Sequence, residues 1–396
     1  MTDGVDRAAC QAAGMDANRL EALVGFLDRT YLATGKLPHM QLLLSRDERP
    51  LVAVTRGAAR TTGEPLRDDA LFRIASMTKP VTSVAFMMLV ESGRVALDTP
   101  VTDVIPEFAD LRVGQANRAR PKRAMLMIDL LRHTSGLTYG LQRQTPIDAR
   151  YRKLGLDEFQ QKRTSDQFVA DLSTLPLEFS PGDRWNYSVS TDVLGVVVER
   201  LSGIDLETVF RTRIFDPLAM VDTTFVLPDD KADRMTDAWR LDEAGGLAIA
   251  DIGARSGWRR TGRFLSGGGG LVSSAADFHR FARMLLRGGE LDGVRLLAAE
   301  TVEQMRSNQL PGGGDLSTMS SAMFSEADYQ DVGFGLGLAM GMESQEYYWG
   351  GVFSTYFWID PLARLIGIFM TQHLPSSTYP VRAELRVGVA GAVLRR

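Results

Sequence analysis

The sequence of 396 residues contains one cysteine and few histidines. A single cysteine, Cys10, excludes an internal disulfide and a zinc site made of several cysteines. The histidines lie far apart and never show the H-E-x-x-H spacing of a helical metal site; they are His39, His133, His279 and His373. We therefore expect neither a metal nor another cofactor.

Long apolar runs and an excess of positive charge are also absent. No stretch approaches the roughly 20 apolar residues that a membrane-spanning helix needs, and the N-terminal segment MTDGVDRAACQAAGMDANRL is mixed and acidic, unlike a secretory signal. The formal net charge is -4 and no long basic run occurs, which argues against a nucleic-acid partner. We expect a cytoplasmic protein without membrane or nucleic-acid partners, either a monomer or a small homo-oligomer.

The apolar pattern places strands near both ends of the chain and helices between them. Strands rich in aromatic and β-branched residues are predicted as a hairpin at 40–59, and again at 346–360 and 364–372. Helical spacing is found at 16–35, in several pieces between 98 and 220, and at 275–289 after a glycine run. This order predicts an α/β lobe built from both termini, with a helical lobe inserted into it.

A serine and a lysine three residues apart stand out in LFRIASMTKPVTSVAFMMLVESGR. Pro80 fits only the first turns of a helix, which places Ser76 near a helix N-terminus. At i, i+3 the side chains of Ser76 and Lys79 share one face. Burial and the positive helix end lower the pKa of a lysine, so Lys79 is suited to take the proton of Ser76 and make it a nucleophile.

Taken alone, a match to S-x-x-K is accidental in most chains. The competing serine-hydrolase design is weak here, because no G-x-S-x-G segment of the α/β-hydrolases occurs. A Ser-His-Asp triad stays open, since its members need not be neighbours in the sequence.

Three further segments carry a family resemblance. They are HTSGL at 133–137, FSPGDRWNYSVSTDVLGVVVERLSG at 179–203 and YYWGGVF at 347–353. With S-x-x-K before them, these segments resemble, in type and order, the active-site motifs of serine β-lactamases and penicillin-binding proteins. Within that group the chain is most similar to the class C β-lactamase-like esterases, the family VIII carboxylesterases, and to the related polyketide acyltransferases.

The resemblance implies a fold of mixed α/β (α+β) type. An antiparallel sheet flanked by helices would be joined to an inserted all-helical lobe, with the active site between the two. The resemblance spans a single catalytic unit at 20–390. Residues 1–78 and 227–396 would form the α/β lobe, and residues 79–226 the helical lobe.

The resemblance also assigns roles to individual residues. Ser76 would be the acylated nucleophile, Lys79 its proton partner, and Tyr187 a second acid or base that protonates the leaving group and then activates water. The backbone N–H groups of Ser76 and Val352 would form the oxyanion hole. A phenol with an ordinary pKa near about 10 acts as a base only if neighbouring groups stabilise its anion.

The expected substrate pocket includes Tyr139, Trp349, Gly350 and Gly351. Packing roles for Tyr139 and Trp349 remain open, as does a β-bulge at the two glycines. Penicillin-recognising enzymes usually have Y-x-N, whereas this chain has Val189 at the third position. They also have Lys or His where Trp349 stands here, so the cation that would meet a substrate carboxylate is missing at this position. Replacement by an Arg or Lys from elsewhere in the chain stays open. Both departures favour a neutral, partly apolar ester.

Two neighbouring features are expected to have structural roles. The run Gly267–Gly270 lacks the Lys-Ser/Thr of a phosphate loop, so we interpret it as a tight turn beside the site. His133 is expected to support its own loop.

The sequence therefore predicts a serine carboxylesterase that hydrolyses small, neutral, short-chain acyl esters. An acyltransferase that delivers the acyl group to an alcohol is the main alternative. A weak β-lactamase or D,D-peptidase is disfavoured by Val189 and Trp349. A non-catalytic binding protein would have no need to keep Ser76, Lys79 and Tyr187 together.

Overall fold

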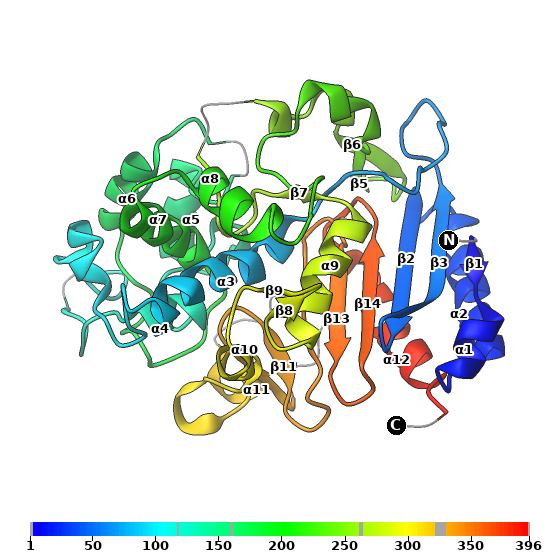
Figure 1. Cartoon of the computed structure of the whole chain (residues 1–396). Coiled ribbons are helices and arrows are strands. Elements are labelled where there is room, and N and C mark those ends of the chain that lie inside the picture. Colours follow the sequence, from blue (N-terminus) through cyan, green and yellow to red (C-terminus); the bar gives the residue numbers. More distant parts are fainter. Residues whose placement is uncertain (1–2, 117–118, 159–160, 261–263, 321–329, 395–396) are drawn as a thin grey trace.

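An eight-stranded antiparallel sheet forms the centre of the fold (Figure 1). The computed structural model describes residues 3–116, 119–158, 161–260, 264–320 and 330–394. The strand order is β1-β3-β2-β14-β13-β12-β11-β10. The bounds are β1 Gly4–Val5, β2 His39–Arg46, β3 Arg49–Gly57, β10 Val332–Phe334, β11 Ala339–Gly341, β12 Tyr347–Gly350, β13 Tyr356–Asp360 and β14 Leu365–Met370. Since β2 pairs with β14, the two ends of the chain build one sheet, as predicted.

The sequence-predicted strands are confirmed. β2 and β3 form the hairpin expected at 40–59, which begins one residue earlier; it is paired from His39 opposite Gly57 to Arg46 opposite Arg49. β12, β13 and β14 occupy the two aromatic-rich segments near the C-terminus. Their side chains are almost all buried, which explains the dense aromatic and β-branched composition.

Helices cover both faces of the sheet. α9 (Ala275–Leu286) packs on β13 and β14 and lies in front of them in Figure 1, whereas α12 (Val381–Ala390) lies behind. α12 packs against α2 (Ala17–Leu27), which is next to α1 (Arg7–Ala12). The helix predicted over 16–35 is thus confirmed, although its last part, Asp28–Leu32, has the wider π-helical turn.

The helix that follows Ser76 runs through the interior. α3 (Thr78–Glu91) packs against α7 (Ser190–Ser202) and α8 (Leu206–Phe210) and is buried from Thr78 to Met87. A helix that is apolar on all sides fits such an enclosed position. The remaining helices are α4 Met127–Leu131, α5 Pro146–Leu154, α6 Ser165–Ser173, α10 Ala299–Arg306 and α11 Leu316–Met319. The lobe boundaries at 78/79 and 226/227 stay a prediction.

Short strand pairings fix the chain on either side of the catalytic candidates. β4 (Phe72–Arg73) pairs with β7 (Val272–Ser273), which brings the segment before Ser76 beside the glycine run. Two further small sheets complete the fold. They consist of β5 Ala238–Leu241, β6 Leu247–Asp251 and β15 His373–Leu374, and of β8 Glu290–Leu291 with β9 Val294–Arg295.

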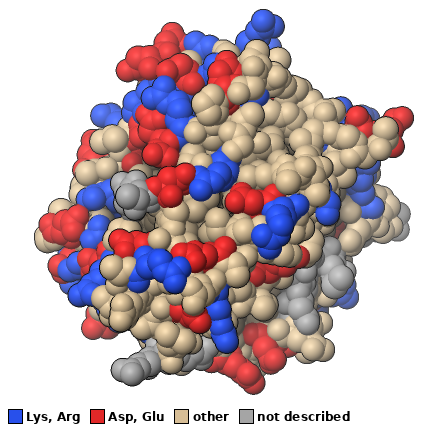
Figure 2. All heavy atoms as spheres, turned by 90° about the vertical axis from the view of Figure 1, so that its right-hand side faces the viewer, with Lys and Arg blue, Asp and Glu red and all other residues tan. Residues whose placement is uncertain are grey.

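The surface carries charges of both signs side by side. On the face that includes α1 and α2, lysines and arginines alternate with acidic residues (Figure 2). Ion pairs such as Arg7–Glu21 and Arg56–Asp3 account for part of this pattern. Within the described part of the chain, every helix is too short or too polar to cross a lipid bilayer.

Candidate active site

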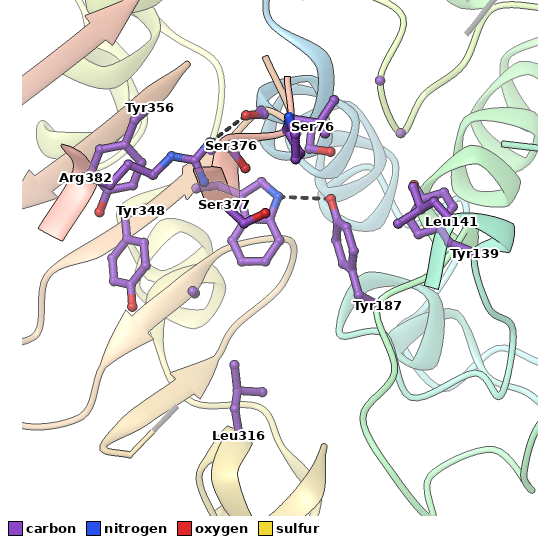
Figure 3. A pocket seen from close by; sticks show the side chains of 18 of the residues that line it. Ser76, Tyr139, Leu141, Tyr187, Leu316, Tyr348, Tyr356, Ser376, Ser377 and Arg382 are labelled. Atoms are coloured by element: carbon purple, nitrogen blue, oxygen red, sulfur yellow. Dashed lines mark hydrogen bonds between the residues drawn. The ribbon is translucent and has the colours of Figure 1, made fainter. Parts of the chain in front are cut away.

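Ser76 lies where a tight turn enters α3, at the wall of a large cavity (Figure 3). The turn Ala75–Met77 is a single 3-10 turn, and the predicted helix start is confirmed. Ala75 has a φ of 43°, a left-handed conformation that is uncommon for a residue other than glycine. Such strain is often found next to functional groups, where the surrounding structure holds it in place. The cavity has a volume of about 710 Å³.

Lys79 lies one turn further along and reaches Ser76. Its Nζ is 3.2 Å from the Ser76 Oγ, and it donates to the Gly268 carbonyl at 2.6 Å and to the Tyr139 hydroxyl at 3.1 Å. Burial lowers the pKa of Lys79 to about 7, against the opposing charge of Asp192. A neutral amine has two N–H groups for Gly268 and Tyr139, and its lone pair is then available to the Ser76 hydroxyl.

Tyr187 lies just before α7, which begins at Ser190, and is held from two sides. Its hydroxyl accepts a hydrogen bond from Nε1 of Trp349 at 3.4 Å, drawn as a dashed line in Figure 3. The rings of His133 and Tyr139 pack against the Tyr187 ring, with 4.9 and 5.2 Å between the ring centroids. Burial raises the pKa of Tyr187 above its ordinary value, although hydrogen bonds with Ser76 and Trp349 oppose this. The phenol therefore keeps its proton in the resting site.

Tyr139 packs against its neighbours and also lines the cavity, so a packing role and a place in the pocket do not exclude each other. It is 7% exposed and lines the cavity wall. Its hydroxyl accepts from Lys79 and is 3.5 Å from Oδ2 of Asp192. Burial raises the pKa of Tyr139 well above 10, helped by the charge of Asp192.

Asp192 is a site residue that the sequence reasoning missed. It lies in the first turn of α7, fully buried by its surroundings, and accepts from Ser266 Oγ and from the Gly268 N–H at 3.1 Å. Burial raises the pKa of Asp192, whereas the charge of Lys79 lowers it. The signal that could have found it is a single acid directly before the apolar run VLGVVV of a buried helix.

The glycine run lies beside the site, as predicted. A Cβ at Gly268 would be 2.4 Å from Oδ2 of Asp192, and one at Gly267 would be 2.8 Å from the Thr191 carbonyl. Side chains are therefore excluded here. The absence of side chains lets the Gly268 backbone approach both Lys79 and Asp192.

The end of β12 forms the opposite wall of the cavity. Trp349, Gly350, Gly351 and Val352 all line it. The pairing of β12 with β13 is unbroken from Tyr347 to Gly350, so the glycines do not mark a bulge in this ladder. Gly351 instead lets two backbone segments approach each other closely, because a Cβ at this position would lie 2.3 Å from the Ile74 carbonyl oxygen.

Residues with supporting roles surround these groups. His133 is fully buried and uncharged, since burial lowers its pKa well below 6.5; its Nδ1 is 3.3 Å from Ser188 Oγ. Val189 is buried at the start of α7, and its N–H donates to the Thr138 carbonyl. Arg382 on α12 also lines the cavity, and no sequence motif had pointed to it.

Comparison with known proteins identifies the family. The sequence model described as Beta-lactamase matches residues 26–391, and the chain belongs to this family. The expected antiparallel sheet with flanking helices is the fold of that family and is confirmed.

Individual relatives include proteins that are named esterases. Protein Rv1367c of Mycobacterium tuberculosis is 37% identical over 84% of this chain and 85% of its own length. Esterase EstB of Burkholderia gladioli is 34% identical over 68% of this chain and 71% of its own length. Among solved structures, EstCE1, described as a hydrolase with promiscuous acyltransferase activity, superposes with a TM-score of 0.78 at 24% identity. That match covers 94% of this chain and 98% of the other.

Proposed function

We propose that this protein is a serine carboxylesterase that hydrolyses small, neutral esters through an acyl-enzyme on Ser76. The observation that carries the proposal is the contact between Ser76 Oγ and the Nζ of Lys79, whose pKa burial lowers to about 7. A lysine that is partly neutral at neutral pH is a general base matched to its task. The similarity to esterases of the same family supports this reaction class.

In the first half-reaction the Ser76 hydroxyl attacks the ester carbonyl carbon. Its proton passes to Lys79 Nζ as the Oγ–C bond forms, and the carbonyl oxygen becomes an oxyanion. The N–H groups of Ser76 and Val352 are proposed to bind this oxyanion. Ser76 supplies its N–H from the first turn of a helix, where such groups lack partners within the helix.

Tyr187 is proposed to act as the acid that releases the alcohol. Its hydroxyl is protonated and faces the cavity beside Trp349. When the bond between the carbonyl carbon and the alcohol oxygen breaks, the leaving alkoxide takes the Tyr187 proton, and the Lys79 ammonium replaces it. In the second half-reaction water attacks the acyl carbon and gives its proton to Tyr187, whose own proton passes to Lys79. The Oγ–C bond then breaks, the carboxylic acid leaves, and the Lys79 ammonium returns a proton to Ser76 Oγ.

The preference for neutral esters is argued from Val189 and Trp349. Val189 offers no carboxamide to a lactam side chain, and Trp349 places an indole where related enzymes have a cation. Tyr139, Tyr187 and Trp349 form an aromatic wall beside Ser76, while Arg382 and Arg386 also line the cavity. A short acyl chain and a neutral alcohol match this wall.

Acyl transfer to an alcohol is the second candidate, and the size of the cavity favours it. A volume of about 710 Å³ leaves room for an acceptor beside a short acyl group. The acyl-enzyme is the same in both reactions, and only the molecule that discharges it differs.

Intact-protein mass spectrometry distinguishes these functions. The protein is incubated with p-nitrophenyl butyrate or with a cephalosporin, and release of each product is followed. A transient butyryl adduct with fast ester turnover and little lactam opening is expected. A long-lived adduct that alcohols discharge would assign acyl transfer, rapid lactam opening would assign a β-lactamase, and no adduct would refute the mechanism.

A further inference from the structure

Arg382 reaches from the C-terminal helix to the turn that carries Val352. It is the second residue of α12, and Figure 3 shows its guanidinium between Tyr356 and Ser76. Its Nη2 donates to the Gly351 carbonyl at 2.5 Å and to the Thr355 carbonyl at 3.0 Å. Both carbonyls belong to the turn between β12 and β13, so one guanidinium nitrogen bridges its two ends.

The same turn is fastened to the nucleophile segment from its other side. Thr355 Oγ1 donates to the Ile74 carbonyl at 3.3 Å, and Ile74 lies two residues before Ser76. A Cβ at Gly351 would lie 2.3 Å from that carbonyl, so the turn packs directly on the segment. Within the turn, the Gly351 N–H donates to the Thr355 carbonyl at 2.9 Å. The turn is thus clamped between Ile74 and Arg382.

Packing restricts the guanidinium to this position. A Cβ at Gly350 would lie 2.6 Å from Cζ of Arg382, so the arginine occupies the space that a side chain at residue 350 would need. Cζ also lies 5.5 Å from the centroid of the Tyr356 ring. A planar group held between a strand and an aromatic ring has little freedom to leave the two carbonyls.

We propose that Arg382 is a positioning residue that holds the Gly351–Thr355 turn so that the Val352 N–H faces the oxyanion formed at Ser76. This inference rests on the proposed esterase function and adds to it the group that orients the oxyanion hole. Oxyanion donors act because they are fixed before the reaction, and a small displacement costs much of their effect. The positive charge of Arg382 also opposes the rise in the pKa of Tyr187, which places this charge close enough to affect the reacting groups.

A pair of ketones tests this role. An alkyl trifluoromethyl ketone adds to the serine and forms a hemiketal oxyanion, whereas the matching methyl ketone binds largely without that addition. Inhibition constants for both are measured with the wild type and with Arg382→Met. We expect the trifluoromethyl ketone to bind about 10- to 100-fold more weakly to Arg382→Met, with a change of less than about 3-fold for the methyl ketone. The value of kcat for p-nitrophenyl butyrate should fall with little change in KM.

Further variants separate position from charge and from general damage. The ketone ratio is the inhibition constant of the methyl ketone divided by that of the trifluoromethyl ketone. Arg382→Lys keeps the charge but cannot bridge the two carbonyls in the same way, so the ketone ratio should return only in part to the wild-type value. Full recovery would overturn the positioning role. Arg386→Met is the matched control, because Arg386 lines the same cavity from the next turn of α12 but bonds to the Glu346 side chain. Its ketone ratio should stay within about 2-fold of the wild type.

Gly350→Ala is a second test if Arg382→Met does not fold. The added methyl group displaces the guanidinium without removing its charge, and the same selective loss for the trifluoromethyl ketone is expected. Equal weakening of both ketones in these variants, or an unchanged ratio, overturns the proposal. Failure of the proposed function looks different, because the wild type itself would then form no hemiketal in its fluorine NMR spectrum and would not cleave the ester.

Discussion

The Nζ atom of Lys79 lies over the face of the Tyr187 ring, 4.7 Å from the ring centroid. The electron-rich face of a tyrosine attracts a cation. The ring is therefore placed to stabilise the Lys79 ammonium that the proposed mechanism requires after Ser76 loses its proton. Burial lowers the pKa of Lys79 and raises that of Tyr187, which agrees with the proposed roles of Lys79 as the base and Tyr187 as the acid.

Ser76→Ala is expected to abolish ester hydrolysis without unfolding the protein. The hydroxyl is the only group that can form the acyl-enzyme in the proposed mechanism, and its removal leaves the packing of the buried turn Ala75–Met77 intact. Initial rates with p-nitrophenyl butyrate and the intact mass after incubation provide the measurement, with circular dichroism as the control for folding. Wild-type turnover in this variant would refute the mechanism.

The rate is expected to rise with pH through about 7, because the proposed mechanism needs the neutral form of Lys79 and burial lowers the pKa of this residue to about 7. The charge of Asp192 favours the ammonium and so raises the pKa of Lys79 against the effect of burial. Asp192→Asn removes that charge, and the rising limb of the kcat/KM profile should move to lower pH. The amide oxygen of Asn can still accept from Ser266 and Gly268. A shift to higher pH would contradict the assignment of this limb to Lys79.

Tyr187→Phe is expected to lower kcat by about 10²- to 10⁴-fold, the usual contribution of a general acid or base. Lys79→Ala should cause a loss of similar or greater size. Since both residues belong to one proton path, the double variant should be little worse than the more damaged single variant. Steady-state kinetics of all three variants provide the test, and losses that multiply would indicate two independent paths.

Trp349→Phe tests the contact between Trp349 Nε1 and the Tyr187 hydroxyl. The bond is long, at 3.4 Å, and the indole also forms part of the cavity wall. We expect kcat to fall by less than about 10-fold, since the aromatic packing against Tyr187 largely remains. Kinetics with short-chain p-nitrophenyl esters measure the loss. A loss as large as that of Tyr187→Phe would assign the indole a direct part in the proton transfer.

The sequence predicted those parts of the fold in which local pattern and tertiary role agree. The strands β2, β13 and β14 are rich in apolar residues because both of their sides are buried, whereas β3 is exposed at its ends and is apolar only in its middle. Two-residue strands such as β1 have no such pattern. β1 exists because the long strand β3 offers it an edge, and its pairing with Ala53 and Val52 is a tertiary contact.

The same distinction between local pattern and tertiary contact explains which site residues could be predicted from the sequence. Ser76, Lys79 and Tyr187 lie in short motifs with fixed spacing, so the sequence brought them to attention. Asp192 and Arg382 reach the site only through folding. The close packing of Gly268 against Asp192, and the helix α12 that carries Arg382 to the Gly351 turn, join residues far apart in the chain. No local spacing encodes such contacts.

The loop HTSGL is held by a buried carboxylate, which leads to a prediction about stability. Asp129 is fully buried and accepts from Arg123 at 2.6 and 2.9 Å, from Thr134 Oγ1 at 2.8 Å and from the Leu126 N–H at 2.9 Å. Burial acts against the charged form, but these hydrogen bonds lower the pKa of Asp129 overall. Its stabilising contribution is therefore present above the ordinary carboxyl pKa and is lost as the pH falls through the lowered value.

Asp129→Ala is expected to reduce the free energy of unfolding by about 1–3 kcal/mol, because it leaves the buried hydroxyl of Thr134 and the Leu126 N–H without their acceptor. Arg123 contributes less to this loss, since its side chain is 37% exposed and water can replace the carboxylate. Asp183→Ala is the control. Asp183 pairs with the well-exposed Lys122 at 2.8 Å, and loss of such a surface pair should cost less than about 1 kcal/mol. Urea unfolding of both variants at neutral pH provides the comparison. Equal losses for the two would mean that the buried carboxylate contributes no more than a surface ion pair and that other contacts hold the HTSGL loop in place.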